Sequence, residues 1–69
     1  MSQYVRWIIA EKVKFYRQQK GLTREELSLL LDFDNSYISK LERMKINITI
    51  DRLEKIAEFF NIKLKDLIT

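Results

Sequence analysis

The chain contains no cysteine, histidine or proline and only one glycine among its 69 residues. The absence of cysteine excludes disulfides, thiolate metal sites and cysteine nucleophiles. The absence of histidine removes the commonest metal ligand and the usual general base near neutral pH. A chain so poor in glycine and proline also lacks the residues on which the turns of an all-β protein depend. We therefore expect a compact all-α domain that holds neither a metal nor a cofactor.

Long apolar runs are also missing. The longest cover residues 7–10 and 29–31. A membrane span needs about 20 apolar residues, and the centre of a secretion signal needs roughly 7–15. We therefore expect a cytoplasmic protein without a membrane partner.

The net charge of +3 conceals an uneven distribution along the chain. Residues 1–24 carry +5, residues 25–34 carry −4, residues 35–48 carry +2 and the remainder is neutral. Two basic blocks around an acidic segment favour a polyanionic partner. Charge alone leaves a solvated surface as an open alternative.

Apolar periodicity and capping residues predict the first two helices. Apolar side chains at three- and four-residue steps indicate a helix over residues 3–20, which Gly21 ends. Thr23 and Glu26 have the spacing of a capping box, which opens a second helix that runs to about Leu31.

Three further helices follow, for a total of five. Asp34 is a good N-cap, so a third helix is expected over residues 35–43. Residues 44–48 form a connection, and Thr49 is expected to cap a fourth helix that ends at Asn61 in the left-handed conformation. The last apolar residues form a final helical turn or two.

Signals for catalysis are poor. Asp32 and Asp34 begin a pattern like that of a calcium loop, but Tyr37 and Arg43 occupy the positions where such a loop needs glycine and glutamate. The serines have no histidine to activate them. We expect no enzymatic activity, no catalytic residue and no small-molecule ligand.

The second and third helices lie close together in the sequence. Two short helices separated by a three-residue turn within residues 23–42 have the spacing of a helix-turn-helix. Ser28 is small enough for a close helix crossing, and Asp32 can adopt the left-handed conformation that the turn needs. Ile38 and Leu41 give the third helix its buried stripe.

The outer face of the third helix changes in character along its length. At 100° per residue, Ser36, Ser39, Lys40 and Arg43 point away from the buried stripe. Small polar residues near the start suit contacts with base edges, and basic residues further on suit phosphates. A plain solvated surface is the alternative.

At this point the sequence resembles the Cro/C1-type (XRE-like) helix-turn-helix family, whose fold is the lambda-repressor-like DNA-binding domain. The matching stretches run from Arg17 to Leu27, from Tyr37 to Arg43 and from Leu53 to Ala57. Residues 33–39, together with Asn47-Ile48-Thr49-Ile50, are most similar to the controller proteins of restriction–modification systems. Phage repressors and antitoxins share much of the pattern and are the alternative.

The resemblance implies a transcriptional regulator that binds double-stranded operator DNA, with RNA polymerase as a further potential partner. It implies base-reading roles for Arg24, Asn35, Ser36, Ser39 and Lys40. It implies phosphate contacts or a positioning role for Tyr37, Arg43, Lys45, Asn47 and Thr49. It also implies a structural ion pair between Arg17 and Glu42, with DNA contact as the alternative for Arg17.

Surplus apolar residues within the C-terminal segment 59–69 predict a homodimer. These residues are Phe59, Ile62, Leu64, Leu67 and Ile68. A dimer would place two recognition helices in successive major grooves, about 34 Å apart, on a near-palindromic site. The alternative is that all five residues close the core of a monomer.

The sequence departs from the family where glycine is usual. Asp32, Met44 and Asn61 occupy those positions. Asp and Asn adopt the left-handed conformation at modest cost, but Met does not, so the sequence leaves the conformation of residues 43–48 open. Asn35 stands where controller proteins often carry arginine, which predicts a different operator sequence. A small adaptor without specific DNA binding is the rival function of another class.

Overall fold

The computed structural model describes all residues, Met1–Thr69. It contains five helices and no strand, which confirms the expected all-α class. The helices are α1 (Gln3–Gln19), α2 (Arg24–Leu30), α3 (Tyr37–Glu42), α4 (Ile50–Phe60) and α5 (Lys65–Ile68). None of them combines the length and the apolar character that a membrane span requires.

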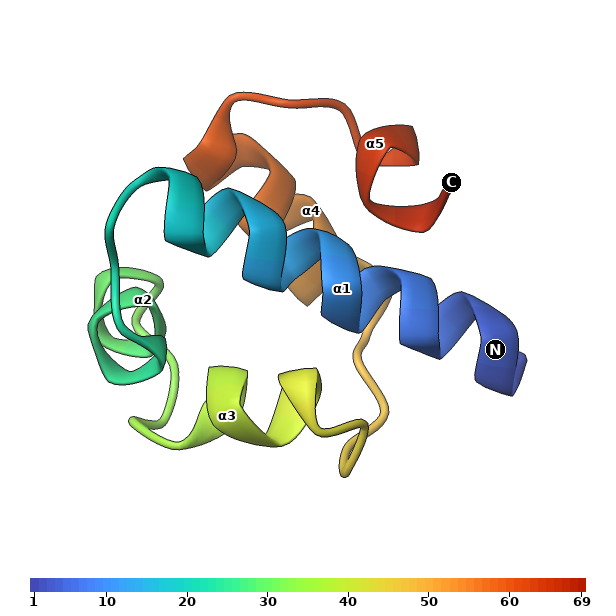
Figure 1. The fold of residues 1–69 in the computed structure, drawn as a ribbon, viewed down its shortest axis with the longest axis horizontal. Coiled ribbons are helices and arrows are strands. Elements are labelled where there is room, and N and C mark those ends of the chain that lie inside the picture. The colour runs from blue at the N-terminus through green and yellow to red at the C-terminus, as the bar shows by residue number, and fades with distance from the viewer.

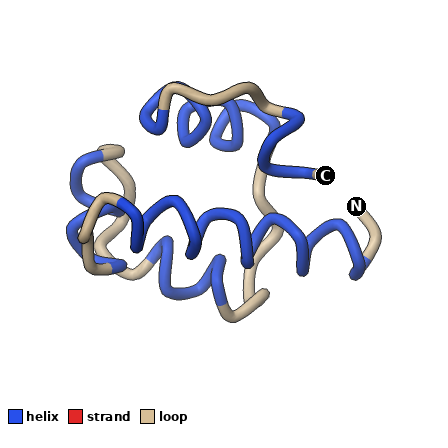
Figure 2. Tube along the Cα trace, turned by 45° about the horizontal axis from the view of Figure 1, so that its top comes forward, coloured by secondary structure: helices blue, strands red, loops and turns tan.

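The long helix α1 lies across the middle of the molecule (Figure 1). In that view α3 lies below it, α5 above it and α4 behind it, and α2 lies near its C-terminal end. Packing joins α1 to α3 and to α5, and α2 to α3. Both chain ends lie on the same side of the molecule in both views (Figures 1 and 2).

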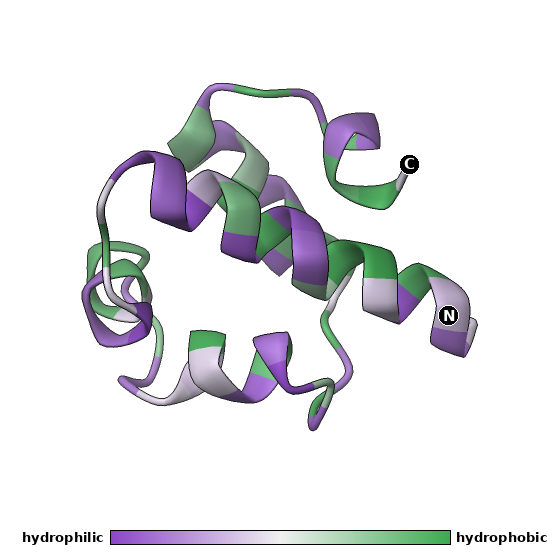
Figure 3. Cartoon of the chain, viewed as in Figure 1, coloured by the Kyte–Doolittle hydropathy of each residue, from purple (hydrophilic) through white to green (hydrophobic).

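Every helix contributes to one apolar core. The core side chains are at most 7% exposed, and fully burying an aliphatic side chain stabilises a fold by about 1.5–3 kcal/mol. They are Ile9 and Val13 from α1, Leu27 from α2, Ile38 and Leu41 from α3, Leu53, Ile56, Ala57 and Phe60 from α4, and Leu67 from α5, with Leu31 from the turn. Figure 3 shows apolar and polar segments alternating along α3, whose buried residues are Ile38 and Leu41.

Most helix ends follow the local signals of the sequence. The Thr23 hydroxyl accepts from Glu26 N at 3.0 Å and the Glu26 carboxylate accepts from Thr23 N at 2.8 Å, which confirms the capping box. The hydroxyl of Thr49 accepts from Arg52 N and caps α4. Gly21 and Asn61 have φ angles of 68° and 57°, so both end their helices in the left-handed conformation as expected.

The predicted start of α3 is wrong by two residues. The helix begins at Tyr37, and Asp34 is not its N-cap. Asp34 Oδ2 instead accepts from Ser36 Oγ at 2.6 Å and from Ser36 N at 3.3 Å, which closes a turn over Asn35. Asn35 and Ser36 therefore precede the helix.

Candidate nucleic-acid interface

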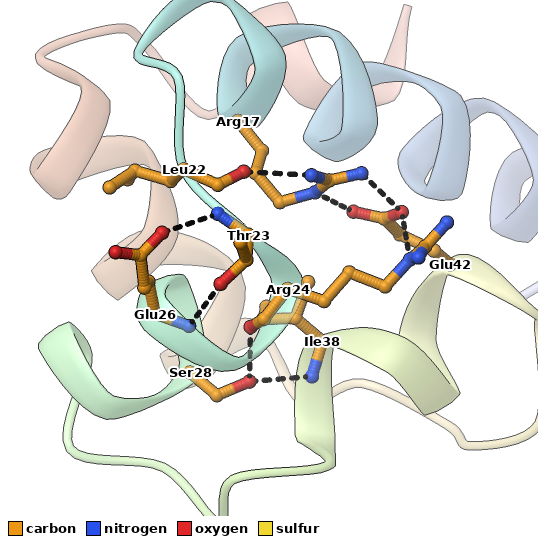
Figure 4. A network of polar contacts seen from close by, with 8 residues as sticks. All are labelled: Arg17, Leu22, Thr23, Arg24, Glu26, Ser28, Ile38 and Glu42. Atoms are coloured by element: carbon orange, nitrogen blue, oxygen red, sulfur yellow. Dashed lines mark hydrogen bonds and ion pairs between the residues drawn. The ribbon is translucent and has the colours of Figure 1, made fainter.

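Ser28 joins the two helices of the helix-turn-helix. It is fully buried in α2, where its hydroxyl donates to Arg24 O at 2.9 Å. The same oxygen accepts from Ile38 N at 3.0 Å, so a residue of α2 satisfies an amide in the first turn of α3 (Figure 4). The sequence indicated the small size of Ser28 but not this hydrogen bond. Asp32 turns the chain between the helices with a φ of 61°, as expected.

A network of ion pairs fixes α3 against α1 and α2 (Figure 4). Arg17 Nε donates to Glu42 Oε2 at 2.7 Å, and its Nη2 donates to Oε1 at 3.1 Å. Arg17 Nη1 donates to Leu22 O at 2.8 Å, which ties in the connection between α1 and α2. Arg24 Nε donates to Glu42 Oε1 at 3.0 Å. One carboxylate thus binds an arginine from each of the other two helices.

Burial divides the two arginines of this network. The side chains of Arg17 and Glu42 are 8% and 4% exposed, whereas that of Arg24 is 51% exposed. Arg17 therefore has a structural place in the core and little surface to offer a ligand. Arg24 is held through Nε only, and its two terminal nitrogens have no partner within the chain.

The outer surface around α3 presents polar and basic groups. Lys40 and Arg43 are exposed, Ser39 is half-buried, and Asn35 is exposed in the turn before the helix. On α3, Ser39, Lys40 and Arg43 therefore lie away from the buried stripe of Ile38 and Leu41.

Ser36 and Asp34 form a polar pair at the edge of this surface. The Ser36 hydroxyl and amide donate to Asp34, and with a smaller effect from Lys40 they hold the pKa of the Asp34 carboxyl below its ordinary value. Because the Ser36 hydroxyl donates its proton to Asp34, its Oγ can bind a ligand only as an acceptor.

The connection between α3 and α4 is held by Arg6 of α1, a residue that the sequence gave no reason to single out. Met44 adopts the left-handed conformation with a φ of 59°, although methionine does so at a cost of about 1–2 kcal/mol. Arg6 Nη2 donates to Met44 O at 3.3 Å and to Ile46 O at 3.2 Å. These two hydrogen bonds from α1 fix the backbone of the connection, in which the side chains of Lys45 and Asn47 are exposed.

The side chain of Tyr37 packs against neighbouring groups and does not present its hydroxyl to solvent. Its Oη is buried and has no hydrogen-bond partner. Its ring lies 4.7 Å from that of Phe33, and the Arg52 guanidinium lies 4.6 Å and 4.8 Å from the Tyr37 and Phe33 rings. Of the two roles that the resemblance implies for Tyr37, this burial supports positioning. The part played by Arg52 depends on tertiary packing and has no local sequence signal.

The predicted dimer residues of the C-terminal segment differ in burial. Leu67 is 0% exposed in the single chain, so it belongs to the core and offers no surface to a second copy. Its place among the predicted dimer contacts is therefore wrong. Phe59, Ile62, Leu64 and Ile68 pack against the core but stay partly exposed.

Comparison with known proteins agrees with this geometry. The family described as Helix-turn-helix matches residues 13–67. The chain belongs to this helix-turn-helix family. The family predicted from the sequence is thereby confirmed.

Individual relatives and solved structures similar to this chain include restriction–modification controller proteins and a transcription factor. Control protein C.BamHI of Bacillus amyloliquefaciens is 32% identical over 69 residues, which covers 99% of this chain and 85% of that protein. The hypothetical transcription factor NHTF from Neisseria has a TM-score of 0.90 at 29% identity, over 94% of this chain and 75% of that one. The restriction–modification controller protein C.AhdI from Aeromonas hydrophila has a TM-score of 0.81 at 27% identity, over 90% and 94%.

Proposed function

We propose that this helix-turn-helix protein is a sequence-specific transcriptional regulator that binds a near-palindromic operator as a homodimer. We further propose that it is a controller protein that regulates its own gene and an endonuclease gene. The observation that carries the proposal is the helix-turn-helix itself, in which Ser28 and Glu42 hold α3 with its polar and basic side outward. The similarity to C.BamHI and C.AhdI supports the controller assignment.

In this proposal base edges are read at the start of α3. Asn35, Ser39 and Lys40 reach into the major groove, since their side chains make no hydrogen bond within the chain. Ser36 Oγ, as an acceptor, pairs with the amino group of cytosine or adenine. Arg24 presents its free terminal nitrogens to a base or a phosphate.

Phosphate contacts come from the following segment. Arg43, Lys45 and Asn47 are exposed beside the recognition helix. Thr49 is exposed as well; its hydroxyl oxygen accepts from Arg52 N, and its O–H remains free to donate to a phosphate. Such contacts set the register of the protein on DNA without reading its sequence.

Binding to the DNA upstream of its own gene tests the proposal. Fluorescence anisotropy with that DNA and with a scrambled duplex should show a preference for the upstream sequence at physiological salt. Replacing Lys40 with alanine should change the binding free-energy difference between the preferred operator base and the other bases by about 1–3 kcal/mol. Lys63→Ala, on the exposed link before α5, is the matched control and should leave the preference unchanged.

The alternatives predict other outcomes. An adaptor that binds an acidic protein through its basic surface should show equal, weak binding to both duplexes. A phage-type repressor or antitoxin regulator should also bind specifically, but its gene should lie beside genes other than those of a restriction–modification system. An adjacent endonuclease and methyltransferase would separate the controller from these relatives. Transcription with purified RNA polymerase would then show whether the protein activates, represses or does both.

A further inference from the structure

Arg52 lies against two aromatic rings beside the recognition helix. Its guanidinium carbon is 4.6 Å from the centroid of the Tyr37 ring and 4.8 Å from that of the Phe33 ring. The two rings are themselves 4.7 Å apart. A cation at this distance is attracted by the negative charge on the face of an aromatic ring. The rings therefore hold the guanidinium of Arg52, from the first turn of α4, against the first residue of α3.

A second cation shares the Phe33 ring. Lys55 lies three residues after Arg52 on α4, and its Nζ is 5.3 Å from the centroid of that ring. Both Arg52 and Lys55 are exposed. Two like charges beside one ring repel each other, and an anion bound between them relieves this repulsion. We call Arg52 and Lys55, together with the rings of Phe33 and Tyr37, the cation platform.

Neither cation of the platform is neutralised within the chain. The ion pairs of the chain are those of Glu42 with Arg17 and Arg24, so Arg52 and Lys55 have no carboxylate partner. Their side chains also donate no hydrogen bond to another residue. An arginine that is held in place with unused N–H donors is suited to bind an oxyanion such as phosphate.

Two carboxylates adjoin the cation platform along the chain. Asp32 and Asp34 stand immediately before and after Phe33, and both are exposed. Their negative charges repel the phosphates of DNA that approaches the start of α3. The charges of Arg52 and Lys55, held at the ring between these two acids, oppose that repulsion where the DNA backbone would meet the turn.

The cation platform lies at the N-terminal end of the recognition helix. Tyr37 is the first residue of α3, and the proposed base-reading residue Asn35 is two positions before it. The major groove is only about 12 Å wide and is bordered by both phosphate backbones, so a cation beside the helix is near phosphates. We propose that Arg52 and Lys55 bind a backbone phosphate beside the bases that α3 reads. The inference rests on the proposed DNA binding and adds a contact outside the segment from Arg43 to Thr49.

The two rings hold the guanidinium in place before DNA arrives. A long side chain loses conformational entropy when a ligand immobilises it, and this loss weakens binding. Arg52 is already held against Tyr37 and Phe33, so it loses less when it binds a phosphate. Phe33 is therefore a positioning residue that acts through Arg52.

The salt dependence of DNA binding tests the inference. Each phosphate that a protein neutralises adds about 0.9 to the slope of log K against log salt concentration. In fluorescence anisotropy across a salt series, the double variant Arg52→Gln, Lys55→Gln should lower this slope by about one for each bound copy. Its preference for the upstream duplex over the scrambled duplex should stay unchanged, because a phosphate contact carries no sequence information.

Two further variants separate charge from position. Phe33→Leu keeps both cations but removes the ring they share, so affinity should fall roughly two- to five-fold with an unchanged salt slope. Lys63→Gln removes the same charge from the link between α4 and α5, which lies on the other side of α1 from α3 (Figures 1 and 2). As the matched control, it should leave both the affinity and the slope unchanged.

Duplexes with one uncharged phosphate locate the contact. A methylphosphonate is placed in turn at each backbone position of the upstream site, and binding of the wild type is compared with that of the double variant. At one position in each half-site, the substitution should weaken the wild type but leave the double variant unaffected.

Several outcomes would overturn the inference. These are equal salt slopes for the wild type and the double variant, an equal fall in slope for Lys63→Gln, and methylphosphonate losses that are the same in both proteins at every position. Circular dichroism melting checks that each variant folds, and Arg52→Lys with Lys55 intact should restore the slope. The slope is also measured on the scrambled duplex. A wild type without preference for the upstream duplex would refute the proposed function, whereas a fall in slope on the scrambled duplex would leave this inference standing.

Discussion

Ser28 shows how much a single hydroxyl contributes to the recognition unit. It links the carbonyl of Arg24 to the amide of Ile38 inside the protein. Replacing Ser28 with alanine leaves that amide buried without an acceptor, so unfolding free energy should fall by about 1–3 kcal/mol. Urea denaturation measures the change. Ser39→Ala, where the hydroxyl makes no hydrogen bond within the chain, should change stability by less than about 0.5 kcal/mol.

Asp32 is an exposed residue in the left-handed conformation. It has a φ of 61°, which glycine adopts without the penalty that a side chain incurs. Asp32→Gly should therefore raise the unfolding free energy by about 0.5–1 kcal/mol, and Asp32→Val should lower it. Thermal denaturation distinguishes the two. Equal effects of glycine and valine would contradict the conformational argument.

Asp34 should make stability depend on pH in a defined direction. Its carboxyl has a lowered pKa because Ser36 donates to the charged form through its hydroxyl and its amide. A lowered folded-state pKa gives stability that is complete above the ordinary carboxyl pKa of about 4 and is lost as pH falls through the lowered value. The stability difference between wild type and Asp34→Ala should therefore shrink on acidification from pH 6. A difference that grows on acidification would have the wrong sign for this mechanism.

At the scale of elements, the helix ends divide by the source of their caps. The start of α2 and the ends of α1 and α4 depend on residues within one turn, namely Thr23 with Glu26, Gly21 and Asn61, and sequence alone placed them correctly. The start of α3 depends on Ser28, ten residues earlier on another helix. A local reading chose the nearby Asp34 instead and was wrong by two residues.

The connection between α3 and α4 is stabilised from α1. Arg6 holds the carbonyls of Met44 and Ile46 in a conformation that Met44 adopts only at a cost. Arg6→Met should lower stability by about 1–3 kcal/mol and speed hydrogen exchange of the amides of residues 44–48. Lys63→Met, at an exposed position, serves as the control. Unchanged exchange in the Arg6 variant would show that the connection holds its own shape.

At the scale of the whole molecule, Glu42 joins three helices through one buried carboxylate. Removing it leaves Arg17 buried without its partner, which costs about 3–5 kcal/mol. A small domain has a total stability near the low end of 5–15 kcal/mol, so Glu42→Ala should leave only about 0–2 kcal/mol and melt at a much lower temperature than wild type. Circular dichroism melting measures this. The exposed Glu54→Ala is the control and should melt close to wild type.

Whether the sequence predicted a feature of the site depends on how far apart along the chain the interacting residues lie. The turn at Asp32, the outward side of α3 and the pairing of Arg17 with Glu42 follow from spacing or from family resemblance. The burial of Leu67, the unpartnered Tyr37 Oη and the stacking of Arg52 on two rings depend on how distant segments meet. No periodicity along the chain contains that information.

The division of labour within α3 has a consequence for how such a protein can evolve. The helix has six residues, too few to be stable alone, and its position depends on Ser28, Glu42 and the buried Ile38 and Leu41. The side chains of Asn35, Ser39 and Lys40 take no part in that anchoring. Mutation at these three positions is therefore nearly free of a stability penalty, so a lineage can drift from one target sequence to another while its fold stays under unbroken selection.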